Sequence, residues 1–96
     1  MRMVKLMADY ECFPLWEASP GQVGNINPDE LPISAGLRSK LVQWAAEYDA
    51  TLNRDDPAQS GFPTDEAKAE FKRTGTELGE QLKSELGSNF SVVVKV

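Results

Sequence analysis

The sequence has no histidine and a single cysteine, Cys12, and these two shortages remove much of the chemistry open to a small protein. Histidine is the commonest general base and metal ligand, and the usual partner of a nucleophilic serine or cysteine. A lone cysteine cannot form an internal disulfide, which fits a reducing compartment. Because the preceding residue Glu11 disfavours a thiolate, we expect Cys12 to be buried or inert.

Basic clusters and long apolar runs are also missing. The net charge of −5 is spread over 96 residues, and a chain without a basic patch gains little from phosphate contacts, so nucleic acids and anionic membranes are not expected partners. Lys5, Asp9 and Glu11 interrupt the apolar N-terminal residues before they could form a signal-peptide core or span a bilayer, which favours a bacterial cytoplasm. A basic protein is the expected partner, because complementary charge speeds encounter.

The length predicts one domain, residues 1–96, with strands at both ends. Alternating apolar residues predict a strand over 2–8, and a β-branched run predicts a half-buried strand over 90–96. The residues expected to face the core are Val4, Leu6 and Ala8 in the first strand and Phe90, Val92, Val94 and Val96 in the last.

A Pro/Gly-rich segment follows the first strand. Residues 9–33 hold four of the six prolines, so no long helix is expected there. A long structureless loop is uncommon in a small domain, so we expect it to pack down and to supply a short third strand from 10–26. The apolar residues available for this packing are Phe13, Leu15, Trp16, Val23, Ile26, Leu31 and Ile33.

Two helices are predicted in the second half of the chain. The first covers 34–53 with Ser34 as N-cap, and the second covers 64–86 with Thr64 as N-cap and Gly87 as a left-handed stop. Their apolar stripes are Leu37, Leu41, Trp44, Ala45, Tyr48 and Leu52 in the first helix and Ala67, Phe71, Thr74 or Gly75, Leu78, Leu82 and Leu86 in the second.

The predicted fold is therefore a two-layer α+β domain in the order β-loop-α-α-β. A small sheet of two to three strands packs on an antiparallel helix pair. Gly75 and Gly79 lie inside the second helix, where each costs about 1 kcal/mol relative to alanine. Close packing against a neighbouring element is the favoured explanation, and a self-association face is the alternative. The last strand has only Lys95 as a charged guard, so its edge is the expected surface of a homodimer.

The polar loop 54–63 follows the first helix. The run from Asn53 to Asp56 has oxygen ligands, but an EF-hand would need a ligand at Pro57, and no metal or other cofactor is expected. A turn is the better interpretation, with Asp55 or Asp56 accepting local backbone N–H bonds before Pro57.

Three strings, LMADYECFPLW, GNINPDELPIS and WAAEYDATLNRDDPAQSGF, resemble those of small stand-alone bacterial proteins of uncharacterised function over most of the chain. No activity is assigned to that family, so the resemblance implies a bacterial cytoplasmic domain and supplies no catalytic residues. The candidate binding residues, taken from these strings and the polar loop, are Tyr10, Trp16, Asp49, Asn53, Asp55, Asp56, Ser60 and Phe62.

Two functions are compatible with these features. The first is a non-catalytic protein-binding module, an inhibitor or immunity-type protein that covers a basic, toxin-like partner. The alternative is a small enzyme or ligand-binding protein that uses carboxylates of the 9–11 and 49–56 segments, namely Asp9, Glu11, Asp49 and Asp55. Carboxylates that converge in a concave pocket would favour this alternative.

Overall fold

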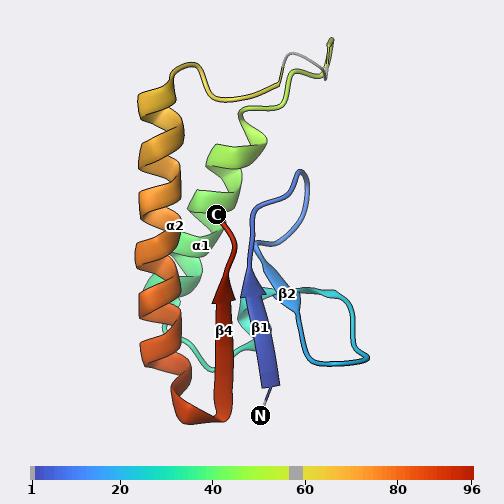
Figure 1. The fold of residues 1–96 in the computed structure, drawn as a ribbon, viewed down its shortest axis with the longest axis vertical. Helices are drawn as coiled ribbons and strands as arrows, with labels where there is room; N and C mark the ends of the chain where they lie inside the picture. The colour runs from blue at the N-terminus through green and yellow to red at the C-terminus, as the bar shows by residue number, and fades with distance from the viewer. Residues whose placement is uncertain (1, 57–59) are drawn as a thin grey trace.

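The computed structural model describes residues 2–56 and 60–96. It is an α+β fold in which four strands form one sheet and two long helices pack beside it (Figure 1). The elements in chain order are β1 (Arg2–Leu6), β2 (Leu15–Glu17), β3 (Asn25–Ile26), the 3-10 turn η1 (Pro28–Glu30), α1 (Ala35–Asp49), α2 (Asp65–Leu86), the 3-10 turn η3 (Gly87–Asn89) and β4 (Phe90–Val94).

The sheet is mixed, with the strand order β3-β2-β1-β4. β1 pairs antiparallel with β2 and parallel with β4, so the strands from the two ends of the chain are neighbours. The sequence predicted two to three strands, and the fourth was missed because segment 9–33 supplies both β2 and β3. A two-residue strand such as β3 is too short to show an alternating pattern, and only its pairing with β2 defines it.

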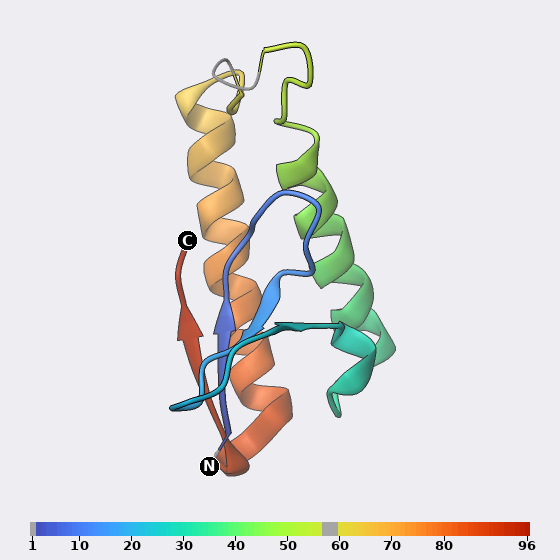
Figure 2. The ribbon, with the colours of Figure 1, turned by 90° about the vertical axis from the view of Figure 1, so that its right-hand side faces the viewer.

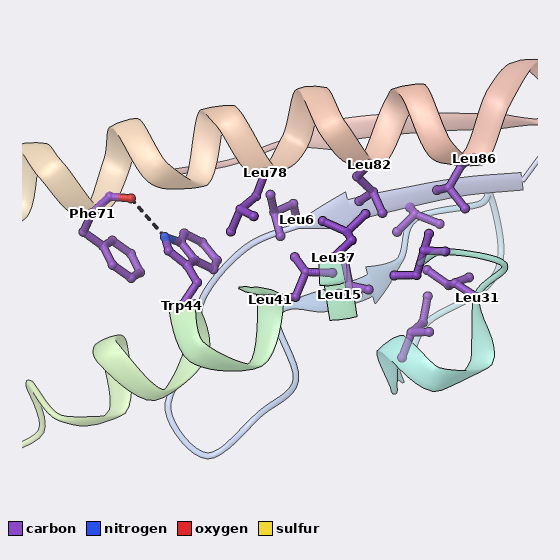
Figure 3. Packing of buried hydrophobic residues seen from close by; sticks show 13 residues of the cluster. Leu6, Leu15, Leu31, Leu37, Leu41, Trp44, Phe71, Leu78, Leu82 and Leu86 are labelled. Carbon is purple, nitrogen blue, oxygen red and sulfur yellow. Dashed lines mark hydrogen bonds between the residues drawn. The ribbon is translucent and has the colours of Figure 1, made fainter. Parts of the chain in front are cut away.

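The core lies between the sheet and the helices (Figure 3). Val4 and Leu6 of β1 are fully buried and face the helices, as predicted, while the intervening Lys5 is only partly buried. The other buried apolar residues are Leu15, Ile26, Leu31, Ile33, Leu37, Leu41, Trp44, Phe71, Leu78, Leu82 and Leu86.

Two apolar residues expected to pack the long loop down do not do so. Val23 is 96 % exposed at the turn between β2 and β3, and Phe13 is 42 % exposed just before β2. Val23 lies on a turn that leads away from the sheet, and Phe13 lies on the loop before β2, outside the buried core cluster. Trp16 is half-buried on β2, and its indole Nε1 donates to the backbone oxygen of Met7 at 2.9 Å.

Helix α1 begins where the sequence predicts and ends earlier. The Ser34 hydroxyl oxygen accepts the N–H of Leu37 at 3.2 Å, which confirms the N-cap. The helix ends at Asp49 rather than at residue 53. The hydroxyl of Thr51 donates to the Tyr48 carbonyl at 2.6 Å and satisfies an acceptor that the next helical turn would have used.

Helix α2 confirms both of its predicted ends. Thr64 accepts the N–H of Ala67 through its side chain, and Gly87 follows the helix with φ of 75°. The chain then returns along α2 as β4, which ends at Val94, two residues before the predicted strand end (Figure 1).

The two interior glycines of α2 mark close packing. A Cβ placed on Gly75 would lie 2.7 Å from Cζ2 of Trp44, and one placed on Gly79 would overlap the side chain of Val94. Both glycines are buried against α1 or the segment of β4. The close-packing interpretation is therefore confirmed, and the idea of a self-association face through these glycines is wrong.

The antiparallel helices bring the end of α1 and the start of α2 to the same end of the molecule (Figure 1). The β1–β2 loop, residues 7–14, reaches toward this end and lies across α1 (Figure 2). This arrangement places the loop beside the C-terminal half of α1, where the candidate site is found.

Candidate functional site

A shallow groove of about 350 Å³ runs between the β1–β2 loop and α1, and we call it the loop–α1 groove. Most of its lining is apolar, and two of its large side chains are open to solvent: Phe13 is 42 % exposed and Val42 is 52 % exposed. The lining residues are Glu11, Cys12, Phe13, Pro14, Asn25, Val42, Ala45, Ala46 and Asp49.

The loop wall of the groove is fastened to α1 and to the residues that follow it. Tyr10 stacks on Tyr48 with ring centroids 4.5 Å apart, and its hydroxyl lies 2.9 Å from that of Thr51. The backbone N–H of Glu11 donates to Oδ1 of Asp49 at 2.9 Å. These contacts join residues about forty positions apart in the sequence, so only the folded chain forms this wall.

A side-chain clamp fixes the other end of the loop. Asn25 of β3 accepts the Phe13 N–H at 2.8 Å and donates back to the Phe13 carbonyl at 2.7 Å and to the Leu15 carbonyl at 2.9 Å. The Asn25 side-chain amide bonds both the N–H and the carbonyl of Phe13, so the backbone that carries the phenyl ring is held in place.

Glu11 carries backbone strain at the rim of the groove. Its φ is 59°, in the left-handed region that costs a non-glycine residue roughly 1 kcal/mol. The bond from its N–H to Asp49 and an ion pair of 2.9 Å between its carboxylate and Arg54 accompany this conformation. Glu11 and Asp49 are the charged residues of the lining, which therefore carries two negative charges and no positive one.

The predicted site residues divide between the groove and the supporting structure. Asp49 lines the groove, and Tyr10 holds the loop wall in place. Phe62 packs on Phe71 with ring centroids 5.0 Å apart. The indole of Trp16 on β2 is held by its hydrogen bond to the carbonyl of Met7. Their contacts are those of structural residues, and a binding role for them stays a prediction.

The polar loop is organised differently from the prediction. The side chain of Asn53, rather than of Asp55 or Asp56, accepts the local N–H bonds: its Oδ1 receives the N–H of each aspartate at 3.1 Å. The backbone of Asn53 in turn donates to the Ser60 hydroxyl at 2.8 Å. An asparagine forms this turn well because its side chain mimics a backbone carbonyl. Pro57, the expected end of the turn, lies outside the described residues.

Sequence reasoning missed the apolar part of the groove. Val42 falls off the apolar stripe of α1 and lies beside Ala45 at the edge of that stripe, a signal for an exposed valine on the flank of the helix. Phe13 was assigned to loop packing, and its exposure depends on where the loop turns. Cys12 was expected to be buried or inert; it is half-buried and lines the groove, and its inertness stays a prediction.

A second pocket, of about 200 Å³, lies on the other side of Tyr48. Lys68, Lys72 and Lys95 surround it, and its aromatic floor includes Trp44 and Phe71, which are 1 % and 8 % exposed. Burial raises the pKa of the Tyr48 phenol, with further contributions from Tyr10 and Asp9, so Tyr48 is neutral at physiological pH.

The carboxylates of the enzyme alternative are divided between the groove and its surroundings. Glu11 and Asp49 both line the groove, whereas Asp9, Asp55 and Asp56 do not. The Asp49 carboxylate holds the backbone of Glu11, and the Glu11 carboxylate is paired with Arg54, so the two acids are not arranged around a shared position for substrate. Among residues 2–56 and 60–96, no three metal-ligating side chains lie close enough to hold an ion.

Comparison with known protein families decides the class of the molecule. A family model described as Serratia CdiI immunity protein-like matches residues 2–95, which include every element of the fold. The chain belongs to this immunity protein-like family. Its function is that of a non-catalytic, immunity-type protein-binding module, as hypothesised from the sequence, and its partner is a toxin-like protein.

Other comparisons add little to this assignment. A search among curated proteins found no match.

Within the part of the chain that the structure describes, no helix combines the length and apolar character needed to cross a membrane. The enzyme alternative has no support from the family, which points to binding rather than catalysis.

Proposed function

We propose that this protein is a bacterial cytoplasmic immunity protein that inhibits a basic, toxin-like protein by covering part of its surface. The family match over residues 2–95 carries this proposal, because it identifies the kind of partner. Inhibition by covering needs no reacting group, and it therefore suits a histidine-free chain with one cysteine.

The charge distribution supports a basic partner. The chain has a net charge of −5, and six of its fifteen acidic residues lie in the segments around the loop–α1 groove. The electric field of a surface with net negative charge attracts a positively charged protein, and this attraction raises the association rate most at low salt. The acidic side chains on the β1–β2 loop, at the end of α1 and in the loop after it are Asp9, Glu11, Glu47, Asp49, Asp55 and Asp56. Arg54 is the basic residue in the described part of these segments, and Lys68 and Lys72 follow at the start of α2.

The proposal is tested with the protein products of the genes that flank the gene of this chain, among which we expect a toxin-like protein. We expect the two purified proteins to form a complex in calorimetry, and co-expression to restore growth to cells that produce the toxin. The association rate should fall as salt is raised from about 50 to 500 mM, because screening shortens the range of the attraction. Absence of a complex at low salt contradicts the proposed function, whereas salt-independent association contradicts only the basic character of the partner.

A homodimer is proposed as the state of the free protein. β4 is an edge strand of the sheet, and its outer backbone groups face no further strand in the described fold. Such an edge is a template for pairing with a second copy.

A further inference from the structure

We infer that the loop–α1 groove is the docking surface for the partner, and that it receives an apolar side chain flanked by a lysine or arginine of the partner. This inference rests on the proposed function, since it takes the occupant to be a basic protein. The family description names no surface, and the sequence did not single out the apolar residues that form this one.

The first support is the exposure of apolar side chains. Few large apolar residues of the described chain are exposed, and Phe13 and Val42 both lie in this groove. Ala45 and Ala46 continue the apolar floor between Val42 and Asp49 on the same side of α1. A contiguous apolar surface bordered by polar groups is typical of protein interfaces, whose centres are depleted in charge.

The second support is the charge at one end of the groove. The Glu11 carboxylate is already paired with Arg54 at 2.9 Å, so Asp49 is the lining charge that an arginine or lysine of the partner would neutralise. Only Oδ1 of Asp49 has a hydrogen-bond partner within the described residues, so the carboxylate keeps acceptor capacity for such a cation. An acidic partner would be repelled here.

The third support is preorganisation. The Asn25 clamp fixes the backbone of Phe13, and the Tyr10 stack fixes the loop against α1. Val42 belongs to the rigid helix itself. Since both walls are already in place, binding requires little ordering of the chain, and less of the interaction free energy is lost.

Two other surfaces fit the partner less well. The lysine-lined pocket would attract an acidic group, and its apolar residues Trp44 and Phe71 are already buried in the core. The outer face near β4 offers an exposed Val93 but lies away from the groove carboxylates, on the strand next to β1. Both surfaces become outcomes of the test below.

The main experiment uses a pair of substitutions of opposite charge at one exposed position. The lysine of Val42→Lys and the glutamate of Val42→Glu are side chains of similar length with good helix propensity, so neither substitution should disturb folding. For the toxin-like protein of the neighbouring gene, we expect Val42→Lys to raise Kd at least about tenfold and Val42→Glu to raise it by less than about threefold. The matched controls are Val93→Lys and Val93→Glu, at a valine of comparable exposure, which should each change Kd by less than about threefold.

Each outcome has a defined meaning. If both Val42 variants bind like the wild type, the groove is not the docking surface. If the Val93 variants weaken binding more than the Val42 variants do, the outer sheet face is the docking surface instead. If Val42→Glu is the weaker binder of its pair, the partner surface is acidic, and the charge assignment is wrong. If the wild type itself does not bind, the proposed function is wrong and this inference fails with it. The other outcomes differ because in each of them the wild type binds.

The native cysteine supplies an independent readout that needs no substitution in the groove. Cys12 is the only cysteine of the chain and lines the groove in a half-buried position. We expect saturating partner to slow its reaction with a thiol reagent at least about tenfold. The control is Ser84→Cys in a Cys12→Ser background, on the exposed side of α2, whose labelling should not change. Equal labelling of Cys12 with and without partner would contradict docking at the groove.

Discussion

Replacement of Gly75 by alanine tests the packing of α2 on α1. A methyl group at this position would approach Cζ2 of Trp44 to 2.7 Å and Cε2 to 3.2 Å. The indole cannot easily move away, because its Nε1 donates to the carbonyl of Phe71 at 2.9 Å and its ring stacks on the Phe71 ring with centroids 4.4 Å apart (Figure 3). The new methyl group therefore meets a side chain that is fixed on both sides.

Two opposing effects set the magnitude. Alanine improves helix propensity by about 1 kcal/mol relative to glycine. Overpacking a rigid core contact costs roughly 2–3 kcal/mol. The overlap is the larger effect, so we expect Gly75→Ala to lower the free energy of unfolding by about 1–2 kcal/mol, or roughly 5–10 °C in Tm.

The matched control is Gly36→Ala in the first turn of α1. Its added Cβ would have only the Ser34 hydroxyl oxygen nearby, at 4.0 Å, so it gains propensity without overlap. We expect this variant to be up to about 1 kcal/mol more stable than the wild type. Both variants are compared with the wild type by urea titration at one protein concentration, followed by far-UV circular dichroism, with the slope m unchanged.

A double-mutant cycle locates the effect at the indole. Trp44→Phe removes the indole atoms that the new methyl group would contact and leaves the contact with Cγ1 of Val96, also at 2.7 Å. Gly75→Ala should therefore cost less in that background than in the wild type. The explanation is refuted if Gly75→Ala and Gly36→Ala change stability equally, or if the cost of Gly75→Ala is the same in both backgrounds.

Three further predictions concern other contacts. Glu85 accepts the N–H of Ser34 at 2.6 Å, and this bond lowers the pKa of the Glu85 carboxyl. The bond therefore stabilises the fold above about pH 4.5, and this contribution is lost as the pH falls through the lowered pKa. In unfolding titrations from pH 7 to 3, the free energy of unfolding should fall less steeply for Glu85→Gln than for the wild type. Trp44→Phe alone should cost about 2 kcal/mol in urea titrations, since it removes the bond to Phe71 and leaves a cavity, and an unchanged midpoint would argue against this role of the bond. Sedimentation at micromolar concentration should give a dimer mass for the free protein; a monomer refutes the proposed dimer, and a dimer that survives Val94→Pro, in a variant shown to remain folded, refutes pairing through β4.

The candidate site shows where sequence reasoning stops being sufficient. Asp49 was identified as a candidate from the sequence, but its bond to the backbone of Glu11 joins residues 38 positions apart. Nothing in the local pattern indicates that pairing. Phe13 was expected to pack the loop down, because an apolar residue in a short domain is more often buried than exposed. Its exposure follows from the path of the β1–β2 loop, which the Asn25 clamp decides.

The sequence by itself determined the features that depend on neighbours a few residues apart. Ser34 and Thr64 cap the helices through side chains that reach backbone three residues on, and Gly87 ends α2 because glycine accepts a positive φ at no steric cost. Alternation over β1 was enough to place Val4 and Leu6 in the core, and the α+β class followed from the order of these elements. The absence of histidine and of a basic cluster argued against histidine-dependent catalysis and nucleic-acid binding, and it left a protein-binding module and a carboxylate-based enzyme as the two hypotheses.

Only the tertiary structure decided the parallel direction of β4 beside β1, the two-residue strand β3, and the loop–α1 groove. These features depend on contacts between distant segments, which are formed only when the helices and the sheet pack together. Phe13 and Val42 form one surface because the fold brings the β1–β2 loop beside α1. The hydrophobic periodicity of the sequence does not indicate that contact.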